Sequence, residues 1–177
     1  MALAIRVALA GDADAIAALH VDIWRRTYRD LAPVAAYDAL DVVARQRNWR
    51  ALLATPKPGS VTLVAEKGGA LAGFAHGGAP ADPAYGDLGE VKYLYVATAF
   101  ARQGIGRALL ATLAGRLADL GYRGIGLGVV VGNDPALAFY RALGAEVIGR
   151  YSDPGPLWRS DNHLCAWVDA QVLARLA

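Results

Sequence analysis

The chain has 177 residues, of which 55% are apolar, and this combination suits one domain with a substantial hydrophobic core. Its net charge of +2, from basic residues spread along the chain, is too small for a nucleic-acid footprint, so we expect no nucleic-acid partner. Cys165 is the single cysteine, which excludes an internal disulfide, and no apolar run approaches the ~18 residues of a membrane span. We therefore expect a soluble, cytoplasmic protein without a membrane partner.

The N-terminal part is predicted to hold one strand and one helix. Apolar residues alternate from Leu3 to Val7, which indicates a strand, and Gly11-Asp12-Ala13-Asp14 caps a helix that should stop near Pro33. Trp24 and Tyr28 stand one turn apart on this helix and can cover the same hollow. Their spacing fits core packing as well as contact with a substrate, so both interpretations stay open. The core face of this helix is predicted to hold Ile16, Leu19, Ile23 and Thr27.

A second helix and a hairpin follow. The helix is predicted to cover residues 37 or 40 to 54, before a Pro/Gly-rich loop. Strands over 61–67 and 70–76 flank Gly68-Gly69, a two-residue turn in which both glycines can take positive φ. Residues 77–89 are rich in Gly, Ala, Pro and Asp, and we expect them to form a surface loop.

The most informative stretch joins a buried strand, 90–96, to an amphipathic helix, 103–120. The loop between them has two glycines one residue apart, so its backbone can approach a ligand where the new helix still has unpaired amides. These amides make an anion site, and the guanidinium groups of Arg102 and Arg107 suit phosphate. Barring a bulge, strand alternation puts Glu90, Lys92, Leu94 and Val96 on one face and Val91, Tyr93 and Tyr95 on the other.

Two familiar phosphate loops do not fit this stretch. A P-loop needs Gly-Lys-Ser/Thr, and no lysine follows the glycines. A dinucleotide fingerprint needs a third small residue where Leu109 stands, and an acidic ribose partner about 20 residues on.

The remaining elements complete a mixed sheet with helices on both faces. A strand over 125–131 carries Gly124, Gly126 and Gly128 on one bare face, which fits either close packing or a slot for a thin ligand. Asp134-Pro135 starts a helix, strands are predicted over 147–151 and 162–168, and a short helix is predicted over 169–176. We expect residues 3–169 to form a single domain and residues 170–177 a C-terminal tail.

Two segments, in order, resemble motifs of the GCN5-related N-acetyltransferase (GNAT) superfamily. Arg102-Gln103-Gly104-Ile105-Gly106-Arg107 resembles motif A, in which a Gln/Arg-x-x-Gly-x-Gly/Ala loop grips the pyrophosphate of acetyl-CoA through backbone amides. It departs from the family at Ala101, where the family has Gln or Arg. Residues 133–146 resemble motif B, with its Asn, its helix carrying a Tyr, and its Gly before the next strand. The resemblance implies an α/β fold with a central, mostly antiparallel sheet, a splayed parallel pair of strands, and helices on both faces.

The resemblance also implies the activity. It indicates an acetyl-CoA-dependent N-acetyltransferase that acts by direct transfer in a ternary complex on the primary amine of a small molecule or an amino-acid-like acceptor. Two alternatives are a protein N-terminal or lysine acetyltransferase and a non-catalytic CoA-binding module. Cofactor contacts are implied at Leu94, Tyr95, Val96, Arg102, Gln103, Gly104, Ile105, Gly106, Arg107, Asn133 and Tyr140.

Roles for single residues follow from the same resemblance. An alkyl ammonium with a pKa near ~10.4 must lose a proton before it can attack, and Glu90 holds the position of the family's base. Tyr140 matches the acid that meets the leaving thiolate, with Phe139 beside it available for packing. A backbone amide near 94–96 would meet the oxyanion, and Trp24, Tyr28 and Glu90 are the candidate substrate contacts.

Metal chemistry is not expected. His20, His76 and His163 have neither metal-ligand spacing nor a Ser or Cys motif beside them. Finally, an edge strand near the C-terminus makes a homodimer plausible.

Overall fold

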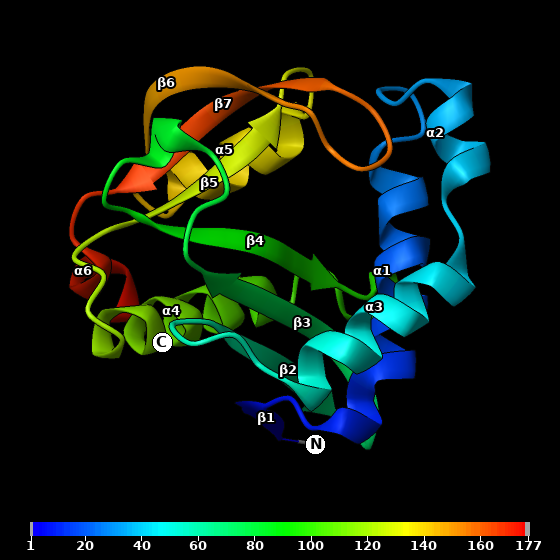
Figure 1. The fold of residues 1–177 in the computed structure, drawn as a ribbon. Coiled ribbons are helices and arrows are strands. Elements are labelled where there is room, and N and C mark those ends of the chain that lie inside the picture. The colour runs from blue at the N-terminus through cyan, green and yellow to red at the C-terminus, as the bar shows by residue number, and fades with distance from the viewer. Residues whose placement is uncertain (1, 176–177) are drawn as a thin grey trace.

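The computed structural model describes residues 2–175, and within them one mixed sheet carries helices on both faces (Figure 1). The strands are β1 (Leu3–Val7), β2 (Val61–Lys67), β3 (Ala70–Gly78), β4 (Gly89–Val96), β5 (Ile125–Val130), β6 (Glu146–Asp153) and β7 (Ser160–Trp167). The α-helices are α1 (Ala13–Thr27), α2 (Val34–Ala39), α3 (Val42–Ala54), α4 (Ile105–Asp119), α5 (Asp134–Ala142) and α6 (Ala170–Ala174). Short 3-10 turns are η1 (Ala10–Asp12), η2 (Pro83–Tyr85) and η3 (Thr98–Phe100).

The sheet confirms the predicted fold class. Its order is β1-β2-β3-β4-β5-β7-β6, and every neighbouring pair is antiparallel except β4 and β5. These two strands pair only at Gly89 with Ile125 and at Glu90 with Gly126. Beyond these positions they separate, and Figure 1 shows β5 diverging from β4. The centre of the sheet is therefore a wedge that opens toward the C-terminal end of β4.

Two apolar layers hold the helices to the sheet. On one face, Ile16 of α1 and Trp49 of α3 pack against Phe74 of β3. On the other face, the leucines of α4 pack against β2, β3 and β5 together with Leu173 of α6. Burying large apolar side chains of this kind stabilises the fold by about 1.5–3 kcal/mol each. Residues 170–174, the first part of the expected tail, are thus helical, and Leu173 is fully buried.

A β-bulge in β4 changes the predicted alternation of its side chains. Tyr93 pairs with His76 and Val91 pairs with Gly77, so Lys92 is the extra residue. Val91 consequently joins Leu94 and Val96 in the layer under α4 instead of facing the same way as Tyr93. The prediction that Val91 shares a face with Tyr93 and Tyr95 was wrong for this reason.

The first helices also differ from their predicted bounds. α1 ends at Thr27, six residues before Pro33. Of the two starts predicted for the helix that ends at Ala54, the later one agrees with α3. A start at Tyr37 was wrong, because Leu40 is extended and buried while the Asp41 carboxylate accepts a hydrogen bond from Val43 N and starts α3. The hairpin prediction is confirmed, with φ of 63° at Gly68 and 79° at Gly69. Among residues 2–175, no helix is both long and apolar enough to cross a membrane.

Candidate active site

The loop before α4 has the backbone conformation that its glycines predict. Gly104 is the N-cap of α4 with φ of 78°, and Arg102 has φ of 62°, which makes it the one non-glycine residue with positive φ in the described chain. A Cβ at Gly104 would meet nothing within 4 Å, so this position faces open space. The loop therefore exposes the first-turn amides of α4, where the helix dipole favours an anion.

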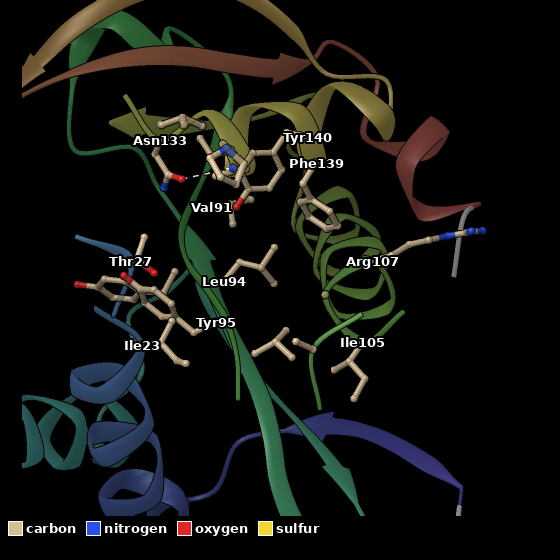
Figure 2. Close-up of a pocket in the computed structure, with 18 of the residues that line it drawn as sticks. Ile23, Thr27, Val91, Leu94, Tyr95, Ile105, Arg107, Asn133, Phe139 and Tyr140 are labelled. Carbon is tan, nitrogen blue, oxygen red and sulfur yellow. Dashed lines mark hydrogen bonds between the residues drawn. The ribbon is translucent and has the colours of Figure 1, made fainter. Parts of the chain in front are cut away.

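This loop forms one side of a cavity of about 990 Å³, whose other sides are β4, β5 and α5 (Figure 2). The cavity is also lined by Ile23 and Thr27 of α1 and by Tyr28, which directly follows this helix. The sequence had assigned Ile23 and Thr27 to the core face of the helix. Almost all the predicted cofactor residues line this cavity, namely Leu94, Tyr95, Val96, Arg102, Gly104, Ile105, Gly106, Arg107, Asn133 and Tyr140. Gln103 does not line it, and its side chain accepts a hydrogen bond of 2.6 Å from Lys67 Nζ. The Arg107 side chain points away from the cavity in Figure 2.

Helix α5 brings Asn133 and Tyr140 to the cavity in different ways. Asn133 is the N-cap of α5, and its Oδ1 accepts a hydrogen bond of 3.3 Å from Ala136 N. Tyr140 packs edge-on against Trp167 and Phe139, and its hydroxyl points into the cavity (Figure 2). Phe139 is 37% exposed, so it is not the buried packing partner that the sequence indicated. Burial raises the pKa of the Tyr140 phenol above its usual range, so the phenol keeps its proton at neutral pH.

A second cavity, of about 280 Å³, adjoins the first. The two share a wall made by Tyr28, Val91, Lys92, Tyr93, Tyr95 and Gly128. The predicted substrate residues Trp24, Tyr28 and Glu90 all line this second cavity. Sequence reasoning missed several further lining residues, among them His20, Arg45, Tyr85, Tyr151, Asp153 and Trp158. Only His20 had a sequence signal, because it stands one helical turn before Trp24 on α1; the others come from α3, η2, β6 and the β6–β7 loop.

Glu90 stands at the start of the wedge, where β4 and β5 still pair. Its Oε2 accepts a hydrogen bond of 2.8 Å from Ala81 N and forms an ion pair of 2.6 Å with Lys92 Nζ. The Glu90 side chain is only 15% exposed, so this is not the solvated strand-end carboxylate that a surface position would give.

Aromatic side chains cover the bare glycine face of β5. A Cβ at Gly128 would overlap the Tyr151 hydroxyl, and one at Gly126 would lie 3.3 Å from the Tyr85 ring. The hydroxyls of these two tyrosines lie 2.9 Å apart in a hydrogen bond. The structure supports close packing at Gly124 and Gly126, which are buried, whereas Gly128 is exposed and lines both cavities. Burial raises the pKa of Tyr151 to about 12.

The far end of the second cavity is closed by aromatic rings. The ring of Trp24 lies 5.3 Å from Tyr28 and 5.4 Å from Trp158, centroid to centroid. Trp158 belongs to the β6–β7 loop, which reaches across to α1 and α2 (Figure 1). Offset and edge-to-face aromatic pairs of this kind add about 0.5–1.5 kcal/mol beyond burial. The wall is therefore both apolar and well fixed.

Two buried histidines pack against the Tyr93 ring of the shared wall, and His20 also lines the second cavity. Nδ1 of His20 accepts a hydrogen bond of 3.2 Å from Trp49 Nε1, and Nδ1 of His76 lies 2.9 Å from Thr62 Oγ1. Burial lowers the pKa of His20 to about 3 and that of His76 to about 4, so both rings are neutral at physiological pH.

Comparison with known proteins adds independent information. A sequence model of the Acetyltransferase (GNAT) family matches residues 16–145. The uncharacterized N-acetyltransferase YuaI of Bacillus subtilis is 31% identical over 142 residues, which cover 80% of this chain and 79% of YuaI.

Solved structures share the fold. The structure of yncA from Salmonella typhimurium with its cofactor acetyl-CoA superposes with a TM-score of 0.70 at 22% identity, over 96% of this chain and 95% of that one. The ribosomal-protein-alanine N-acetyltransferase of Brucella melitensis gives a TM-score of 0.70 at 27% identity, over 93% of this chain and 98% of that one.

Proposed function

The chain belongs to the GNAT acetyltransferase family, and from this premise we propose that it transfers the acetyl group of acetyl-CoA to the primary amine of a small or amino-acid-like acceptor, directly within a ternary complex. The observation that carries the proposal is the pair of adjoining cavities. One is lined by the α4 loop and Tyr140, the other by Glu90, and the two share lining residues of β4 and β5 together with Tyr28. A donor and an acceptor can therefore meet at the wedge.

The first cavity fits the donor. Its volume of about 990 Å³ lies at the upper end of the range for ligand pockets. The exposed amides at the N-terminus of α4 and the side chain of Arg102 suit a diphosphate, whereas Leu127 and Val129 give the β5 side an apolar surface for a thin chain. Acetyl-CoA, bound here, supplies the acetyl group as a thioester.

Glu90 is the proposed base. The Glu90 carboxylate lies at the edge of the acceptor-side cavity, so it can accept a proton from the acceptor's ammonium, directly or through water. This step is needed because an alkyl ammonium with a pKa near ~10.4 is almost wholly protonated at neutral pH. Glu90 lines the second cavity but not the first, which fits a role on the acceptor side.

Tyr140 is the proposed donor to the leaving thiolate, and it lines only the first cavity. A thiol has a pKa near ~8.5, and burial raises the pKa of the Tyr140 phenol further above this value. Tyr140 therefore stabilises the thiolate by donating a hydrogen bond more readily than by giving up its proton. Backbone amides of β4 between Leu94 and Val96 are the candidates for the oxyanion, because no strand pairs with that edge in the described chain.

The alternative acceptor is a protein N-terminus or lysine, and the likeness to the Brucella ribosomal-protein-alanine enzyme favours it. The second cavity argues for the small acceptor, because Trp24, Tyr28 and Trp158 close its far end. A peptide would need an open groove at that position.

The test has two stages. Thermal unfolding with acetyl-CoA at a hundredfold excess over Kd should raise the unfolding free energy by about 2.7 kcal/mol, or Tm by about 5 to 10 °C for this size. A panel of small amines and peptides is then assayed for release of CoA thiol. Thiol release with peptides but not with small amines would favour the alternative, and a missing Tm shift would contradict donor binding.

A further inference from the structure

Glu90 and Arg45 line the second cavity from different elements, β4 and α3. Glu90 is paired with Lys92, whereas the positive charge of Arg45 acts on the His20 ring of α1. Asp153 is not confined to one side, because its negative charge acts on Tyr28 as well as on Tyr85 and Tyr151. We call the part of the cavity next to α1 and α3 the Arg45 end.

Arg45 differs from the other ionic groups that line this cavity. Lys92 is paired with Glu90, and Asp153 Oδ1 accepts a hydrogen bond of 2.8 Å from Gly155 N. Arg45 is half-buried on α3 and forms neither a hydrogen bond nor an ion pair with the rest of residues 2–175. Partial burial of an unpaired cation costs free energy, and this cost is offset when an anion binds. Further along the same helix, Arg50 is paired with Asp14.

His20 adds a second donor at the Arg45 end. Because Trp49 Nε1 donates to His20 Nδ1, the proton of this neutral ring sits on Nε2. His20 is 1% exposed, and its Nε2–H forms no hydrogen bond within residues 2–175. A guanidinium and an imidazole N–H on residues that line the same cavity form a binding set for a carboxylate.

We propose that Arg45 binds the carboxylate of a free amino acid, whose amine then lies toward Glu90 and the wall shared with the first cavity. This inference rests on the proposed function and narrows its acceptor class. A volume of about 280 Å³ lies at the low end for ligand pockets and suits a molecule of amino-acid size. Peptides and amides lack the free α-carboxylate that Arg45 recognises.

The experiment compares acceptors that differ only in this group, for example leucine, leucinamide and 3-methylbutylamine, across side chains of different size. The enzyme variants are Arg45→Gln, Arg45→Lys and, as a matched control, Arg47→Gln, since Arg47 is exposed on the same helix. Acetyl transfer is measured by thiol release. Acceptor binding in the presence of CoA is measured separately by tryptophan fluorescence, since Trp24 and Trp158 line the cavity.

We expect the wild type to bind amino acids about 10- to 100-fold more tightly than the matched amines, as charge-assisted hydrogen bonds predict. Arg45→Gln should remove this preference by raising KM for the amino acids, while kcat stays near the wild-type value. Arg45→Lys should keep part of the preference, and Arg47→Gln should keep all of it. Equal binding of acids, amides and amines by the wild type, or an equal loss for all acceptors in Arg45→Gln, would overturn the inference.

Failure of the proposed function would look different. In that case no acceptor releases thiol, but the fluorescence titrations still compare acids with amines. If Arg45→Gln does not fold, the wild-type comparison and Arg45→Lys decide the question.

Discussion

Replacing Tyr140 by phenylalanine isolates one hydroxyl whose only proposed partner is the leaving thiolate. The hydroxyl forms no hydrogen bond within residues 2–175, and the ring contacts with Trp167 and Phe139 do not need it. Removal therefore leaves no partner group unsatisfied, and stability should change by less than about 0.5 kcal/mol. A hydrogen bond to a charged group is worth about 1.5–3 kcal/mol, which corresponds to a fall in kcat of about 10- to 150-fold.

The assay is single-turnover acetyl transfer with both substrates saturating, so that product release does not mask the chemical step. Tyr122→Phe is the control, because its hydroxyl bonds to Gly59 O at 3.3 Å, away from both cavities. The rate constant for Tyr140→Phe should fall while its Tm and its Kd for acetyl-CoA stay near the wild-type values. An unchanged rate, or a rate loss matched by a fall in Tm, would refute the assignment.

Three further predictions concern the base, the phosphate loop and the buried histidines. Glu90→Gln should lower kcat/KM at least about 100-fold near pH 7, and the loss should become smaller as the pH approaches the pKa of the acceptor amine. Replacement of the exposed Glu146 by glutamine is the control. A loss that does not depend on pH would argue against a role of Glu90 as the base. Gly104→Ala should lower stability by about 1 kcal/mol and raise KM for acetyl-CoA, because the backbone has φ of 78° there, although a Cβ would have room. Gly11→Ala is the control, since a Cβ also has room there and the backbone does not have positive φ, and it should change neither stability nor KM. Burial lowers the pKa of His20 to about 3 and that of His76 to about 4, so as the pH falls these two rings are protonated in the unfolded chain before they are protonated in the folded one. The free energy of unfolding should therefore fall by roughly 1.4 kcal/mol per pH unit per histidine as the pH drops below about 6.5. Urea titrations between pH 7 and 5 check this, and a flat profile would contradict it.

The parts of the fold that were predictable depend on local chemistry. Gly68 and Gly69 define a hairpin because few other residues accept positive φ at two successive positions. The anion site before α4 was also predictable, because the same short run of residues determines both the turn at Gly104 and the exposed amides of the first helical turn.

The parts that were missed depend on contacts between distant segments. Tyr85 and Tyr151 are 66 residues apart and meet only because β6 folds back beside β7, so neither could be assigned to the glycine face of β5. The bulge at Lys92 has no sequence signature, yet it moves Val91 to the other side of the sheet. Arg45 lies on a helix whose orientation over the cavity was unknown before the fold.

The brief pairing of β4 with β5 determines how strongly the middle of this sheet holds together. Residues 91–96 of β4 form no backbone pairing with β5. Along this edge, the two halves of the sheet, β1–β4 and β5–β7, are therefore joined mainly by the side chains that pack under α4. The interior of an α/β sheet is ordinarily its most rigid region. We expect a molecule bound in the gap to contact both halves and to join them more tightly than they are joined without it.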